Sequence, residues 1–273
     1  MDQLLTHPAI QAVVAPFLAA LLVAAPLRRS RLLGLAITTG FAVVIALTAG
    51  FTFESLSATR KLILVGLGAG VVLLAIELAA ISLTPRIRLA LSGAAAIAAV
   101  WVVLRVLQQK DLVPALAGAL GAALYMAALV QSSQWIGDDT VRASASAMML
   151  GLGTGALALL GASGLLAQIG IAVGAAAGAA LLVQMLAGQR APPGAALSLL
   201  ATVVAALAAL LAVFTGSLPW FCLLPTLAAP WATRLVPAGE RPVWLTAFLT
   251  ALAALGPMFL AVGLAWFTAG AST

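Results

Sequence analysis

The segment 195–215, AALSLLATVVAALAALLAVFT, runs for 21 residues without a charged side chain. A transmembrane α-helix needs about 20 consecutive apolar residues, so this segment is long enough to cross a bilayer. Its apolar residues are continuous and do not alternate with period two, which is typical of a membrane helix and not of a barrel strand. Segments of the same kind fill most of the chain from Ile10 to Phe267.

The composition of the whole chain points to lipid as its solvent. Hydrophobic residues make up 64% of the 273 residues and charged residues 7%, and the mean hydropathy is +1.21. The surface of a soluble protein of this length needs far more charge. We therefore predict an all-α, polytopic integral membrane protein that forms a single transmembrane helical domain over residues 1–273, with no soluble domain.

The apolar runs predict nine spans and leave a tenth segment undecided. The nine lie at residues 8–26, 32–50, 62–84, 88–108, 112–135, 143–163, 165–188, 195–215 and 243–267. The tenth candidate, 218–235, is equally apolar but contains Pro219, Pro225 and Pro230, each of which removes a backbone donor. It is either a short kinked span or an interfacial or re-entrant segment.

The positions of the basic residues favour ten spans over nine, because cytoplasmic loops are enriched in Lys and Arg. With the N-terminus outside, seven basic residues lie inside (Arg28, Arg29, Arg31, Arg86, Arg88, Arg142, Arg190) and four outside (Arg60, Lys61, Arg105, Lys110). Arg234 and Arg241 join the inner group only if 218–235 crosses, which changes the ratio from seven against six to nine against four. We expect ten spans with both termini outside.

The residue inventory also narrows location, cofactors and partners. The chain has no Asn and is rich in Ala, Leu and Gly, which favours a GC-rich bacterial genome and hence the bacterial inner membrane. A single histidine, His7, and a single cysteine, Cys222, do not suffice for a haem or zinc site, so we expect no cofactor and no metal. The basic residues are dispersed, which argues against nucleic acid. The remaining expected partners are the lipid bilayer, membrane subunits or further copies of the chain.

Glu77 is the one acid in the middle of a predicted span, and ionisable residues at membrane depth are functional candidates by default. At 100° per residue, Gly66 and Gly70 lie within about 20° of it around the helix. Thr38 and Thr39 of the preceding antiparallel span are expected at a similar depth. In one interpretation Glu77 couples transport by exchanging a proton or by binding a cation with these hydroxyls. In the other it is a neutral acid that hydrogen-bonds across a helix contact.

A second polar cluster ends the fifth predicted span. It contains Gln131, Gln134, Asp138 and Asp139. In the structural interpretation an aspartate caps the following helix and the amides lie at the membrane interface. In the functional interpretation the four side chains line a polar vestibule that leads toward the level of Glu77.

Glycines spaced four residues apart are predicted to be helix-packing positions, because they allow two backbones to approach closely in a bilayer. They are Gly66 and Gly70, Gly151 and Gly155, and Gly170, Gly174 and Gly178.

Three functions fit this architecture. The first is a small secondary permease or ion-coupled carrier with Glu77 as its coupling site. The second is a non-catalytic scaffold or accessory subunit of a membrane complex, favoured by the scarcity of intramembrane polar groups. The third is an enzyme acting on a lipid or isoprenoid, which the length of the chain suits, but the adjacent Asp138 and Asp139 are the only pair of acids that could serve it. The carrier is the leading hypothesis, and we expect no catalytic activity.

Overall fold

The structure is a computed structural model that describes residues 7–51, 56–161, 163–237 and 241–270. Over these residues the fold contains helices and no strand. Nine continuous helical stretches are long and apolar enough to cross a membrane, when η1 is counted together with α2 and η2 together with α3. The prediction of an all-α polytopic membrane protein is confirmed.

In chain order the elements are η1 (Ile10–Val14), α2 (Ala15–Leu27), η2 (Arg31–Gly34), α3 (Leu35–Thr48), α4 (Ala58–Leu78), α5 (Pro85–Leu107), α6 (Leu112–Ile136), α7 (Thr140–Leu160), α8 (Gly164–Ala187), α9 (Ala195–Thr215), η3 (Trp220–Ala228), α10 (Ala229–Ala232), η4 (Thr233–Leu235) and α11 (Val243–Gly270).

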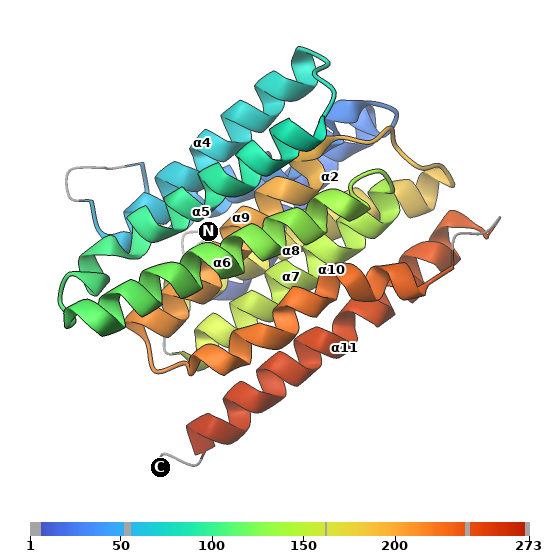
Figure 1. Ribbon diagram of the computed structural model, residues 1–273. Coiled ribbons are helices and arrows are strands. Elements are labelled where there is room, and N and C mark those ends of the chain that lie inside the picture. The colour runs from blue at the N-terminus through green and yellow to red at the C-terminus, as the bar shows by residue number, and fades with distance from the viewer. Residues whose placement is uncertain (1–6, 52–55, 162, 238–240, 271–273) are drawn as a thin grey trace.

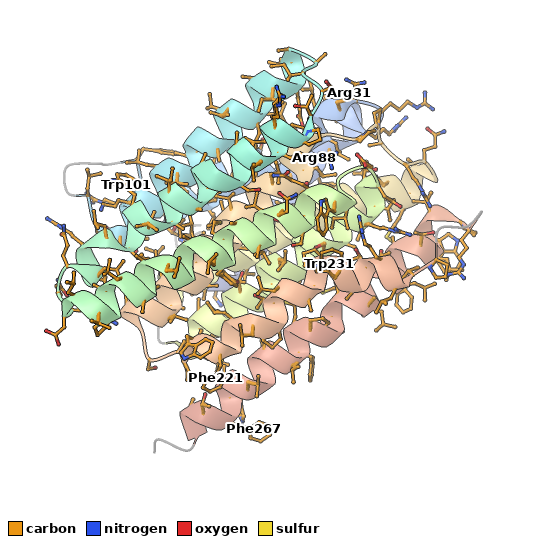
Figure 2. The ribbon with its side chains drawn as sticks, in the orientation of Figure 1. Arg31, Arg88, Trp101, Phe221, Trp231 and Phe267 are labelled. Atoms are coloured by element: carbon orange, nitrogen blue, oxygen red, sulfur yellow. The ribbon has the colours of Figure 1, made fainter. Side chains whose placement is uncertain are left out.

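The long helices lie side by side in one bundle, so the molecule has two ends (Figure 1). We name them after two residues. The Arg88 end is where α5 and α7 begin, and the Lys110 end is at the turn between α5 and α6. Figure 2 shows Arg31 and Arg88 toward the upper right and Phe267 at the lower left, near the opposite end.

Helix α9 occupies the centre of the bundle. Every residue from 195 to 212 is buried, and the helix packs against α4, α6, α7 and α8. A helix that is apolar on all sides is stable only when it is surrounded by other apolar surfaces. By contrast α11 lies at the edge (Figure 1), and Phe248, Phe259 and Trp266 expose 59%, 74% and 67% of their surface, as residues facing lipid do.

The seven glycines singled out in the sequence all lie at contacts. A Cβ atom on Gly151 would lie 2.6 Å from Gly174 Cα, and one on Gly170 would lie 2.8 Å from Gly155 Cα, so α7 and α8 touch backbone to backbone. Gly178 lies against the side chain of Met148. On α4, Gly66 faces Phe41 and Gly70 faces Thr38.

The proline-containing segment is a broken helix made of η3, α10 and η4. Pro219 precedes it, Pro225 lies inside η3 and Pro230 is in the first turn of α10. A 3-10 helix rises by about 2.0 Å per residue, so these 16 residues cover about 30 Å, which is close to the thickness of the hydrocarbon core. Its irregular backbone explains why it is not among the nine continuous helices.

This broken helix runs from the Lys110 end to the Arg88 end. Helix α9 finishes at the Lys110 end, where Lys110 Nζ lies 5.6 Å from the centre of the Phe214 ring. Helix α11 begins at the Arg88 end, where Val243 and Ala247 pack with Val141 of α7. Arg234 donates to the carbonyl of Trp135 at the end of α6, 2.6 Å away. The described chain thus runs along the bundle ten times, nine of them as helices long and apolar enough to cross a membrane, and the tenth membrane span stays a prediction.

Candidate functional site: a charged pocket around Glu77

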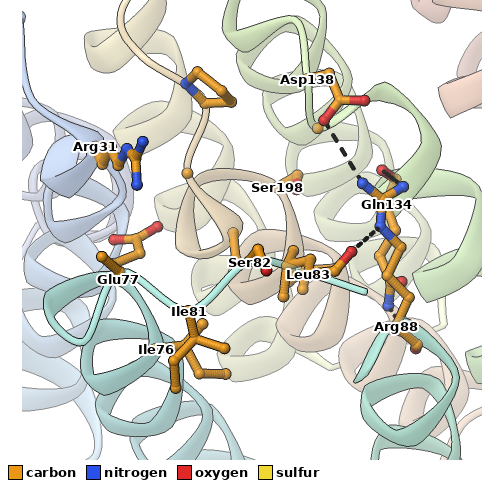
Figure 3. A pocket seen from close by; sticks show the side chains of 16 residues that line it. Arg31, Ile76, Glu77, Ile81, Ser82, Leu83, Arg88, Gln134, Asp138 and Ser198 are labelled. Atoms are coloured by element: carbon orange, nitrogen blue, oxygen red, sulfur yellow. Dashed lines mark hydrogen bonds and ion pairs between the residues drawn. The ribbon is translucent and has the colours of Figure 1, made fainter. Parts of the chain in front are cut away.

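A pocket of about 380 Å³ lies at the Arg88 end, between the α4–α5 turn, the end of α6 and the start of α9. Figure 3 shows it from close by. Its polar and charged lining comes from Arg31, Glu77, Ser82, Arg88, Gln134, Asp138 and Ser198. Residues from five separate parts of the chain therefore meet at one site.

Glu77 reaches this pocket from the last turn of α4 and caps the start of α9. Its Oε1 accepts a hydrogen bond from the backbone N–H of Ala196, 2.8 Å away. The first N–H groups of a helix have no partner within the helix, and the N-cap residue Gly194 has no side chain to supply one. A Cβ at position 194 would lie 2.7 Å from Glu77 Oε1. The glycine therefore makes room for the carboxyl that caps the helix.

The second oxygen of the same carboxyl, Glu77 Oε2, is buried and has no hydrogen-bond partner among the described residues. Burying an unpaired polar oxygen is costly, and burying an unpaired charge is costlier still. The carboxyl therefore favours a proton or a bound ligand at Oε2. The pocket beside it is the space in which such a ligand would fit.

Arg88 is held on the opposite side of the pocket by a set of contacts (Figure 3). Its Nη2 lies 3.6 Å from Asp138 Oδ1, and its Nε donates to the carbonyl of Leu83 at 3.1 Å. Gln134 Nε2 donates to the Arg88 carbonyl at 3.1 Å. Gln134 Oε1 is buried without a partner in the described part of the chain, so a second side chain that lines the pocket has an unused acceptor.

Arg31 is the other cation of the pocket. Figure 3 shows its guanidinium and the Glu77 carboxyl directed toward the same part of the pocket. They are too far apart for an ion pair, and the Arg31 side chain pairs with no other described residue. An unpaired guanidinium and an unpaired carboxyl oxygen thus flank one space.

The structure does not bring Thr38 and Thr39 to this pocket. Their hydroxyls donate to the carbonyls of Gly34 and Leu35, four residues earlier in the chain, and Thr38 packs on Gly70. Gly70 is seven residues before Glu77, about 10 Å along the helix. The expected similar depth is not found, because residues 31–34 form a separate 3-10 turn and α3 starts beyond the level of Glu77.

The four residues of the predicted vestibule divide into two pairs. Gln134 and Asp138 line the pocket with Glu77. Gln131 instead accepts a hydrogen bond from Ser92 at 3.1 Å. Asp139 caps α7 by accepting from the N–H of Val141, and it pairs with Arg142 at 3.4 Å and Arg190 at 3.3 Å. The two aspartates, adjacent in sequence, therefore have different surroundings.

Arg31, Arg88 and Ser198 were not predicted as site residues. The two arginines were assigned only to the charge balance of short loops, and Ser198 is a small polar residue in a long apolar run. A signal existed for Arg88, because it lies at the N-terminal end of a predicted span, where a basic residue opposes the helix dipole. Such a residue is stabilised by an anionic or carbonyl partner nearby.

The described residues contain no group of three or more His, Cys, Asp or Glu side chains that could hold a metal ion. Comparison of the chain with protein-family models, with curated proteins and with solved structures finds no match.

Proposed function

We propose that the protein is a small secondary carrier of a bacterial inner membrane, with Glu77 as the group that couples transport. In this proposal Glu77 alternates between a protonated state and a state in which Oε2 binds the transported solute or a coupling cation. The bundle supplies the membrane-spanning body, and the pocket at the Arg88 end is the binding site in the conformation described. The chain acts by binding and release, without catalysis.

One observation carries the proposal: the Glu77 carboxyl is fixed by one oxygen and unpaired at the other. A carboxyl with only a structural role would be expected to have both oxygens paired or exposed to water. Here the second oxygen is buried, and Glu77 lines a pocket of about 380 Å³, which falls within the usual size of small-molecule sites.

The lining suggests the class of solute. Asp138 already neutralises Arg88, which leaves the Arg31 guanidinium and the Glu77 carboxyl as the groups available to a ligand. A guanidinium binds carboxylate or phosphate through paired hydrogen bonds, and a carboxylate binds an ammonium group. We infer a small solute that carries one negative and one positive group.

The charge distribution supports an orientation with the Arg88 end in the cytoplasm. Nine basic residues lie toward that end in the ten-traverse arrangement and four toward the Lys110 end, and cytoplasmic loops carry the excess of Lys and Arg. In this orientation the chain begins outside and the pocket is open to the cytoplasm.

The test is transport by the purified protein in liposomes that contain a trapped pH-sensitive dye. A panel of small zwitterions, anions and cations is added outside, and proton movement is followed through the dye. We expect a response to zwitterionic solutes in the wild type and its loss in Glu77→Gln, which keeps the Oε1 acceptor but cannot exchange a proton. Asp111→Asn is the matched control, because Asp111 lies at the other end and its side chain does not cap α6. Equal fluxes in wild type and Glu77→Gln would contradict the proposal.

A scaffold or accessory subunit is the second candidate, and the cap on α9 favours it. Because Glu77 Oε1 stabilises the start of the central helix, the acid has a structural use even without a ligand. Purification of the tagged protein from its host in mild detergent, followed by mass spectrometry, separates the two candidates. Partners at fixed stoichiometry that are retained in Glu77→Gln would support the scaffold, whereas purification as a monomer or homo-oligomer would support the carrier.

A further inference from the structure

A second and larger cavity, of about 640 Å³, lies near the Lys110 end between α6 and the broken helix, with α9 as its back wall. It is a groove separate from the Glu77 pocket, and the two share no lining residue. The α6 side of the groove includes the small residues Ala117, Gly118 and Gly121. A Cβ atom on Gly121 would meet nothing within 4 Å, so this part of the groove is open space.

The inner wall of the groove has paired hydroxyl groups that need no water as a hydrogen-bond partner. Tyr125 reaches its inner side, and its hydroxyl lies 2.8 Å from Thr226 Oγ1. Thr226 in turn donates to the carbonyl of Leu223 at 2.7 Å. Because the two hydroxyls satisfy each other and the backbone, the inner wall behaves as an apolar surface. Leu124 and Leu224, exposed by 60% and 51%, form the outer rims, so the groove is continuous with the outer surface of the bundle.

The only charged residue in the lining is Lys110, in the turn between α5 and α6. Its Nζ lies 5.6 Å from the centre of the Phe214 ring, and among the described residues it makes no ion pair. The groove thus combines an apolar channel at membrane depth with one available cation at the bundle end. This is the charge pattern of an anionic amphiphile.

We propose that this groove binds one acyl chain of an anionic phospholipid, whose head group is held at Lys110. The chain lies between α6 and η3, against the open face of Gly121, and the phosphate meets the Lys110 ammonium at the bundle end. The bound lipid fills the space that the narrow 3-10 segment leaves beside the small residues of α6. This site is independent of the carrier function and stands whether or not Glu77 couples transport.

The test uses photocrosslinking in phosphatidylcholine vesicles that hold the full-length protein. The probe is a trace of phosphatidylglycerol with a diazirine in one acyl chain, and the labelled peptides are mapped by mass spectrometry. We expect labelling on the groove faces of α6 and η3 that excess unlabelled phosphatidylglycerol removes and excess phosphatidylcholine does not. Lys110→Gln should reduce the preference for phosphatidylglycerol about fivefold, the contribution of one surface lysine.

A matched pair of variants tests the position of the chain. Gly121→Leu places a side chain in the open groove, whereas Gly93→Leu adds the same side chain to α5, where a Cβ also meets nothing within 4 Å. Gly121→Leu should abolish the competed labelling and Gly93→Leu should leave it unchanged. Labelling spread evenly over the outer helices, equal competition by phosphatidylcholine, or full labelling in Gly121→Leu would each overturn the proposal.

Discussion

The carboxyl of Glu77 and the backbone N–H of Ala196 join the end of α4 to the beginning of α9 across 119 positions of sequence. The bond is 2.8 Å long, and it supplies an acceptor that Gly194 at the N-cap lacks. The central helix of the bundle therefore begins at a side chain that belongs to another helix.

The first prediction concerns the stability that this contact contributes. Glu77→Ala removes the acceptor and leaves the Ala196 N–H buried and unpaired, which should lower the free energy of unfolding by about 1–3 kcal/mol. Glu77→Gln keeps an acceptor oxygen at the same place, so its free energy of unfolding should fall much less. Unfolding of the two variants in detergent, followed by circular dichroism, checks this. Identical midpoints for Glu77→Ala and wild type would show that water caps α9 equally well.

A second prediction addresses the backbone contact between α7 and α8. In an exposed helix, Gly→Ala stabilises by up to about 1 kcal/mol. At Gly174 the new Cβ would lie 2.7 Å from Leu152 N and 2.9 Å from the Met148 carbonyl. Gly174→Ala should therefore be destabilising by about 1–3 kcal/mol, through overpacking.

The control for this variant is Gly263→Ala in α11, where a Cβ meets nothing within 4 Å. It should have the stability of the wild type or slightly more. Thermal unfolding of both variants in the same detergent gives the comparison. If Gly174→Ala were as stable as Gly263→Ala, α7 and α8 would be able to move apart enough to accommodate a methyl group with no loss of stability.

A third prediction concerns the hydrogen bond that fixes the broken helix to α6. Tyr125→Phe removes the hydroxyl that lies 2.8 Å from Thr226 Oγ1 but leaves Thr226 its bond to Leu223. Side-chain hydrogen bonds between membrane helices contribute about 0.6 kcal/mol to stability on average. The free energy of unfolding of the variant should fall by an amount of that order. Denaturant titration in mixed micelles measures the loss. A loss above 3 kcal/mol would indicate that the ring itself shifts.

The fourth prediction tests whether the broken helix crosses the membrane. Single cysteines are introduced at Gln109, at Gln189 and at Arg241, all exposed, and intact cells are treated with a membrane-impermeant maleimide. Arg241→Cys should behave like Gln189→Cys and opposite to Gln109→Cys. The wild type is the control, because its one cysteine, Cys222, is buried. An Arg241→Cys protein that labels together with Gln109→Cys would reduce the count to nine crossings.

The sequence contained enough to predict the class of fold and one face of α4. Glycine spacing placed Gly66, Gly70 and Glu77 on one side of that helix. In the structure Gly66 lies against Val204 and Gly70 against Leu200 of α9, in register with the bond from Glu77 to Ala196. Helical periodicity is a local property, so it identifies the shared face of α4. It does not identify the partner, since several apolar helices offer equivalent surfaces.

The pocket was predictable only in part, for the same reason. Glu77, Gln134 and Asp138 stood out as polar residues within or beside apolar spans. Arg31 and Arg88 did not, because a basic residue at a span end is explained by the bilayer interface alone. Their convergence on Glu77 depends on how the ends of α3, α4, α5 and α6 meet. That arrangement is set by tertiary packing and by the 3-10 turn at Arg31–Gly34.

The partnership of Tyr125 with Thr226 also constrains the order of assembly during synthesis. The Tyr125 hydroxyl, which contacts the broken helix, belongs to a segment that is synthesised 101 residues earlier. The irregular η3 lacks the continuous α-helical hydrogen bonding that satisfies the backbone of an isolated segment in the hydrocarbon core. An isolated segment of this kind is unstable in the hydrocarbon core, because its backbone polar groups lack partners there. It has to dock onto a bundle in which α6 is already in place, so the broken helix joins the bundle only after α6 has been inserted.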